Sequence, residues 1–313
     1  MEAERAGDAR GRGKGGTVMQ STIRRLLPVI FAAFLLWGVT PASAGWEAGA
    51  KAGYDSNLSR SIDDGEGSSY LSVQGGYVKG HSGESRMDWT MGFFVEGAFY
   101  PSIEDIDYAS ATFSPGLAYI FHPGWTVAVT PFLQGKAVQD SDQSALAFGV
   151  RVDFLQKPGG RAYLGEYYAY TDSRASNDVY SYRENAVGAY LGMRWSPGFF
   201  TEVGYEFSRG DSFLSVKVPE APAVGIAAPV GGAGNGGAGG GGAGYGGGMP
   251  QYSKAFDSIV FKEQVDSHSV PVTVGFDWTP RWFSTVNYTY RTWSAESVEA
   301  TDHSGYAGIG YRF

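Results

Sequence analysis

Residues 303–313, HSGYAGIGYRF, end the chain and decide its fold. Every second residue is apolar, so one face of an extended strand carries Ala307, Ile309, Tyr311 and Phe313. Small or charged residues occupy the other face, because successive side chains of a strand point to opposite sides. The alternation predicts a half-buried strand that runs to the last residue of the chain and ends on an aromatic ring.

This ending resembles the closing strand of bacterial outer-membrane β-barrels, in which alternating hydrophobic residues lead to a C-terminal Phe. The resemblance implies that Phe313 is an assembly signal. It also implies that outer-membrane lipid and the barrel assembly machinery are partners of the chain. What it names is an architectural class, the porin-like barrels, and no specific family within it.

The N-terminal region predicts export. Residues 26–39 form an apolar run of fourteen, preceded by Arg24 and Arg25 and followed by an AxA cleavage site that ends at Ala44. This is the pattern of a secretory signal peptide, and the run is short for a membrane-spanning helix. We interpret 1–44 as an N-terminal extension plus signal peptide, with a mature chain that begins at Gly45. An N-terminal membrane anchor is the disfavoured alternative.

Composition narrows the class further. The chain of 313 residues has a formal net charge of −8, which makes nucleic acid an improbable partner. It contains no cysteine, so disulfides cannot hold an exported fold together. After the signal peptide no apolar run approaches the ~20 residues of a spanning helix. A chain of this kind can cross a membrane only as a closed barrel, in which each backbone polar group is paired.

Period-2 runs separated by turn residues predict about twelve strands. The clearest is 86–99, RMDWTMGFFVEGAF, in which Met91 belongs to the apolar face and Thr90 to the polar face. Short turns such as HPG at 122–124 alternate with longer polar connections, as in outer-membrane barrels with short periplasmic turns and long external loops. The predicted fold is all-β: a transmembrane antiparallel up-and-down barrel over residues 45–313, located in the cell outer membrane.

A low-complexity insert interrupts this pattern. Residues 213–265 are predicted to form a long extracellular loop, and their centre, 231–248, has 13 Gly in 18 residues. Such a centre has too few apolar side chains to bury a core and is expected to be flexible. Two interpretations stay open: a tolerated insertion at a loop tip, or a display or plug segment at the mouth of the barrel.

Catalytic or cofactor chemistry is not predicted. The four histidines, His81, His122, His268 and His303, form no spaced metal-binding cluster, so no metal and no cofactor is expected. His268 beside Ser267 or Ser269 could be drawn as a Ser–His pair, as in outer-membrane phospholipase A. That family's nucleophile motif is absent, and adjacent residues of a strand point to opposite faces.

The same alternation predicts which charged side chains point into the lumen. The cations are Lys51, Lys79, Arg86, Lys136, Arg151, Arg194, Arg291 and Arg312, and the anions are Glu47, Asp55, Asp88, Glu96, Asp153, Glu166, Glu202, Glu206 and Asp277. The tyrosines Tyr168, Tyr170, Tyr190 and Tyr306 are predicted inside with them. Two arrangements fit a barrel of this size: a narrow polar lumen partly crossed by ion pairs, or a plugged barrel whose charges satisfy one another.

The function expected from these features is that of a monomeric, narrow, porin-like channel for small polar solutes. A non-conducting surface barrel whose external loops bind a partner or a polysaccharide is the first alternative. A membrane-embedded lipid hydrolase that uses His268 is the second.

Overall fold

The computed structural model describes residues 44–62, 65–81, 86–217, 250–296 and 298–313. The expected signal peptide lies outside the described residues, apart from Ala44, which begins the first strand. The Gly-rich centre, 231–248, lies outside them as well.

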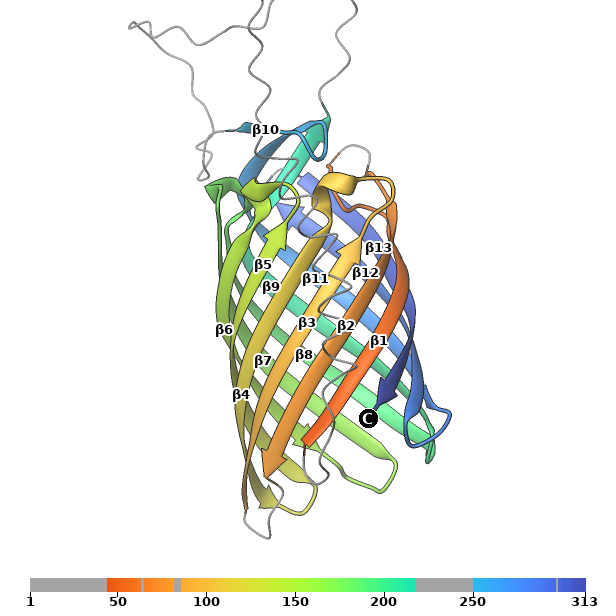
Figure 1. The fold of residues 1–313 in the computed structure, drawn as a ribbon. Helices are drawn as coiled ribbons and strands as arrows, with labels where there is room; N and C mark the ends of the chain where they lie inside the picture. Colours follow the sequence, from red (N-terminus) through yellow and green to blue (C-terminus); the bar gives the residue numbers. More distant parts are fainter. Residues whose placement is uncertain (1–43, 63–64, 82–85, 218–249, 297) are drawn as a thin grey trace, which may run out of the picture. The chain divides into compact units, whose positions relative to one another are not determined.

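Twelve strands form a closed antiparallel barrel, which confirms the predicted fold class (Figure 1). They are β1 (Ala44–Asp55), β2 (Ser68–His81), β3 (Met87–Phe99), β4 (Tyr108–His122), β5 (Trp125–Val138), β6 (Ala145–Gln156), β7 (Ala162–Ala175), β8 (Tyr182–Ser196), β9 (Phe199–Lys217), β11 (Ser258–Asp277), β12 (Trp282–Ala295) and β13 (Val298–Arg312). Neighbours along the chain pair with one another, and β1 pairs with β13 to close the sheet. The short strand β10 (Gln251–Ser253) pairs antiparallel with the first residues of β11 at the top of the barrel in Figure 1.

The two ends of the barrel differ, and we name them by their connections. The C-terminus lies beside the start of β1 at the turn end, where the short connections are (Figure 1). At the opposite, loop end lie β10 and the 3₁₀ turns η1 (Glu104–Ile106), η2 (Ser141–Gln143) and η3 (Asp178–Tyr180). None of the helices in the described residues is long and apolar enough to cross a membrane.

The outer surface is apolar because every second residue of each strand faces away from the barrel. On β3, Met87, Trp89 and Met91 are 52%, 40% and 46% exposed. Aromatic rings gather near the turn end, where Phe154 stacks on Phe121 and meets Trp125 edge-on. An exposed apolar band with aromatic rims is the surface that a lipid bilayer requires.

On the inner wall, several large rings lie flat over glycines of the neighbouring strand. Tyr190 covers Gly165, and Tyr163 covers Gly192, so closely that a Cβ atom at either glycine would collide with the ring. Glycine is therefore required at these places by close approach. The rings consequently lie along the wall and do not project toward the barrel axis.

A buried apolar cluster of the described residues lies at the loop end of the barrel. Ile103, Ile106, Val179, Phe256 and Val260 form one buried cluster, contributed by loop-end connections and by the start of β11. This cluster packs the connections of the loop end into an ordered rim, which positions the candidate site below.

Candidate functional site

The register of the strands places most of the charged residues that were predicted to line the lumen on the inner wall. Residues paired across strands share a face, and side chains on this face contact one another over an intervening strand, as Lys51 of β1 and Glu96 of β3 do. By this criterion the inner wall carries Glu47, Lys51, Asp55, Asp88, Glu96, Lys136, Arg151, Asp153, Arg194, Glu202, Glu206, Asp277, Arg291 and Arg312, with Tyr190 and Tyr306. Arg86 lies just before β3 at the turn end and is exposed.

Glu166 was predicted to point inward, and that prediction was wrong. It pairs with Phe154 of β6 and Ala189 of β8, both of which belong to the outer face, and it is exposed there. Tyr168 and Tyr170 follow it onto the outer face, whereas Tyr163 and Tyr167 point inward. The segment has tyrosines on both faces, so its alternation does not reveal which face is apolar. Cross-strand pairing alone decides the facing.

The prediction that Lys79 points into the lumen was also wrong. It lies opposite Met91 and therefore belongs to the outer face near the turn end. The reason is that the apolar positions of β2, such as Val73 and Tyr77, have the same odd numbering as Lys79.

Among the described residues, some inward charged residues were missed by the sequence analysis. Glu184 and Asp302 lie on the inner face at the loop ends of β8 and β13, where Glu184 pairs with Thr171 and Asp302 with Arg291. Extending the alternation of each strand by a few residues would have found both. Arg60 belongs to the connection between β1 and β2, and no local signal in the sequence directs it inward.

The wall cations are held by aromatic rings of adjacent strands. Four of them face such a ring: Lys51 over Tyr306, Lys136 over Tyr108, Arg151 over Tyr167 and Arg312 over Phe283, at 3.7–5.0 Å from the ring centroids. Cation–π contact gains strength where water is partly excluded. These contacts keep long basic side chains against the wall.

Ion pairs also run along the wall. Within the described residues, the four inner ion pairs are Lys51–Glu96, Arg151–Asp153, Arg312–Glu47 and Arg312–Asp277. Each joins residues of one strand or of strands no more than two positions apart around the barrel. None of these pairs reaches from one side of the barrel to the other, so none obstructs the axis.

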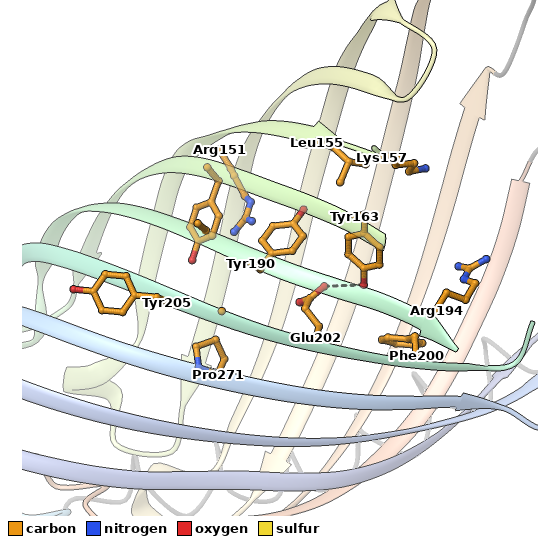
Figure 2. A pocket seen from close by; sticks show the side chains of 13 residues that line it. Arg151, Leu155, Lys157, Tyr163, Tyr190, Arg194, Phe200, Glu202, Tyr205 and Pro271 are labelled. Carbon is orange, nitrogen blue, oxygen red and sulfur yellow. Dashed lines mark hydrogen bonds between the residues drawn. The ribbon is translucent and has the colours of Figure 1, made fainter. Parts of the chain in front are cut away.

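A cavity of ≈610 Å³ lies against β6, β7, β8 and β9 toward the turn end (Figure 2). Figure 2 shows Arg151, Tyr163, Tyr190 and Glu202, from neighbouring strands, bordering the same space. The Tyr163 hydroxyl donates a hydrogen bond of 3.0 Å to the Glu202 carboxylate. Arg194 lines the same cavity, and within the described residues no carboxylate lies within ion-pair distance of it. The wall of this cavity can therefore contact polar solutes through hydroxyl, guanidinium and carboxylate groups.

A second cavity, of ≈390 Å³, lies toward the loop end and is bordered by the connection between β1 and β2. Asn57 organises that connection, because its side chain donates to the carbonyl of Ser61 over 3.0 Å and accepts from the Ser61 amide over 2.8 Å. Arg60 takes a left-handed conformation with φ of 50°. The Ile62 amide then donates to the carbonyl of Ser215 on β9, which ties the connection across the mouth.

Arg60 is the central cation of this loop-end cavity. Its guanidinium lies 5.1 Å from the ring centroid of Phe213 and 5.9 Å from that of Trp293, and it donates to the Ser212 hydroxyl. Burial and the nearby Arg291 guanidinium lower the pKa of Arg60 below its usual range. Lys136, Glu184, Glu206 and Arg291 line the same cavity.

His268, which a lipid hydrolase would use, does not contact the neighbouring Ser267 or Ser269. His268 points outward, where its Nδ1 lies 2.7 Å from the Tyr205 hydroxyl. Ser267 and Ser269 lie on the opposite, inner face and are buried. Within the described residues there is no group of three His, Cys, Asp or Glu side chains that could hold a metal ion.

Comparison with known proteins supports the fold. No family model and no curated protein matches the sequence. Among solved structures, an outer-membrane channel from Pseudomonas putida F1 superposes with a TM-score of 0.52 at 9% identity, covering 89% of this chain and 98% of that one. The KdgM porin (TM-score 0.43, 8% identity, 85% and 99% coverage) and the NanC porin (0.43, 10%, 84% and 98%) are also similar. The chain thus has the fold of outer-membrane β-barrel proteins.

Proposed function

We propose that the protein is a channel through which small polar solutes diffuse across the bacterial outer membrane. The observation that carries this proposal is that the inner ion pairs run along the wall and not across the barrel axis. In a barrel closed by its own side chains, charges from opposite walls would pair across the axis, because charges in a confined interior need partners. Here the charges are held along the wall, by near neighbours and by aromatic rings.

The polar inner surface supports the same proposal. Two cavities, of ≈610 and ≈390 Å³, lie along the lumen and are lined by guanidinium, carboxylate and phenol groups. Twelve strands lie between the ~8 that side chains just fill and the ~16 that enclose a wide aqueous channel. A narrow lumen that admits small hydrophilic molecules agrees with both facts.

The proposal includes the path by which the barrel reaches its membrane. Residues 1–44 would direct secretion and be removed, and Phe313 would serve the assembly machinery as a recognition signal. The loop end, with the residues between Lys217 and Gln251, would then face the cell exterior.

Reconstitution of the mature chain in planar bilayers tests the channel function. We expect discrete conductance steps in KCl, and swelling of proteoliposomes in small sugars with slower swelling as the sugar grows. Protein that is folded by its heat-modifiable migration, but that gives neither steps nor swelling, would overturn the proposal. That result would favour a non-conducting surface barrel instead.

A further inference from the structure

The loop-end cavity holds charges of both signs that are kept apart from one another. Arg60, Lys136 and Arg291 supply three cations, and Glu184 and Glu206 supply two carboxylates, while a third lining carboxylate, Asp211, is paired with Lys262 at 3.8 Å. Within the described residues, none of these five side chains lies within 4 Å of a charged group of opposite sign. The cavity is therefore unlike the turn-end wall, where Arg312 is paired with two carboxylates.

Neutral groups hold four of these five charges in place. Arg291 donates to the Ser269 hydroxyl over 3.1 Å, and Tyr167 donates to the Glu206 carboxylate. Lys136 lies over the Tyr108 ring, 4.3 Å from its centroid. Arg60 is held by Ser212 and by two rings, as described above. The five charged groups thus line the cavity without forming ion pairs with one another.

The positions of the charges around the barrel keep the carboxylates and the cations on different strands. Glu184 and Glu206 come from the adjacent strands β8 and β9. Arg291 comes from β12 and Lys136 from β5, on either side of that carboxylate pair, and Arg60 enters from the connection above. A lone anion would meet the two carboxylates, and a lone cation would meet the three basic groups, so each is opposed by like charges.

We infer that the loop-end cavity is a binding site for small zwitterions of the amino-acid class. Arg60 and Arg291 receive the carboxylate of the solute, and Glu184 and Glu206 receive its ammonium group. The volume of ≈390 Å³ falls at the small end of the range of about 300–1,000 Å³ usual for ligand sites. This inference rests on the proposed channel function and names the solute that the channel favours.

Arg60 is the residue that gives the site its selectivity. The connection that carries it is fixed to β9 by the hydrogen bonds of Ser215, so the guanidinium is preorganised before any solute arrives. A planar guanidinium binds a carboxylate through two parallel hydrogen bonds, which a lysine cannot do.

Three solutes of nearly equal size test the inference: 4-aminobutyrate (zwitterion), butyrate (anion) and butylamine (cation). Each is added to the external side of single channels of the mature protein in planar bilayers at neutral pH. We expect 4-aminobutyrate to interrupt the current at concentrations about tenfold lower than butyrate or butylamine need. Equal effects of all three solutes on a conducting channel would overturn the inference but leave the channel function standing. Absence of conductance would overturn both.

Two charge-neutralising variants assign the two halves of the site. Arg60→Gln should weaken the interruption by 4-aminobutyrate about tenfold and shift preference toward butylamine. Glu184→Gln should weaken it to a similar degree and shift preference toward butyrate. Arg209→Gln and Glu166→Gln, which make the same chemical changes on the outer face, are the matched controls and should leave the preference unchanged. Opposite shifts in the two test variants cannot arise from misfolding, whereas identical shifts would contradict the assignment.

Discussion

The amide of Ser215 donates a hydrogen bond of 3.1 Å to the carbonyl of Arg60. The amide of Ile62 donates to the carbonyl of Ser215 over the same distance, and Ser61 forms a parallel bridge with Ser215. Between β1 and β9 in the barrel wall lie β11, β12 and β13. The connection after β1 therefore passes over three strands at the mouth and brings the Arg60 side chain into the lumen.

Replacing Arg60 by glycine should raise the single-channel conductance in KCl. Glycine accepts the φ of 50° at this position without steric strain, so the backbone bonds to Ser215 should persist while the guanidinium is removed. Arg60→Lys, which keeps the charge and the bulk, is the control and should conduct nearly as the wild type does. An unchanged conductance in the glycine variant would mean that Arg60 does not narrow the path.

A charge added to the outer face should destabilise the barrel far more than one added to the inner face. Met91→Arg places a guanidinium against lipid and should lower the free energy of unfolding by ~2–4 kcal/mol. Thr90→Arg, one residue earlier, directs the same group into the lumen and should have a much smaller effect. Urea unfolding in lipid vesicles measures both, and equal losses would show that the facing of β3 is incorrect.

Removing the outward carboxylate of β7 should stabilise the protein. Glu166 is exposed between Phe154 and Ala189 on the lipid-facing surface, where a charged group is unfavourable. Glu166→Leu should therefore raise the free energy of unfolding by about 1 kcal/mol, a smaller effect than for a basic residue at the same depth. Glu202→Leu is the matched inward control and should destabilise, because it removes the acceptor of the Tyr163 hydroxyl. A loss of stability in Glu166→Leu would indicate that this carboxylate has a binding partner on the outer surface.

Changing the last residue should reduce assembly of the barrel. The Phe313 amide donates to the carbonyl of Trp46 over 2.9 Å, so the chain terminus takes part in closing β13 against β1. Phe313→Asp should strongly lower the amount of heat-modifiable protein recovered from outer membranes, whereas Phe313→Tyr should not. Wild-type levels of the aspartate variant would show that Phe313 is not part of the assembly signal.

Deleting 231–248 should leave the barrel folded. Lys217 pairs directly with Ser258, and the β9–β11 ladder continues from there to the turn end, so the barrel is closed without the deleted residues. Shortening a connection changes its closure entropy only slightly, by ~0.6 kcal/mol for each halving of length. Heat modifiability and the thermal midpoint should both stay near wild-type values. Loss of the folded form would assign the tract a structural role, and a rise in conductance would place it at the mouth.

Much of the barrel could be predicted from local sequence alone. Strand alternation requires only neighbouring residues, and the segment from Met87 to Phe99 carries enough apolar outward positions to fix both its extent and its facing. Where the local signal is ambiguous, facing is decided by pairing. Tyr163, Tyr167, Tyr168 and Tyr170 give β7 aromatic residues on both faces, and Glu166 was misplaced for that reason.

The sequence by itself determined that this chain forms a transmembrane barrel of about twelve strands with charged side chains inside, because period-2 alternation and turn chemistry are local properties. Only the tertiary structure decided which residues these charged side chains contact. Arg60 and Ser212 lie 152 positions apart, and they meet because the sheet closes on itself and the connection after β1 folds over its rim. The charges of both signs in the loop-end cavity are brought together in the same way, from β5, β8, β9, β12 and one connection, and no single segment of the sequence contains them.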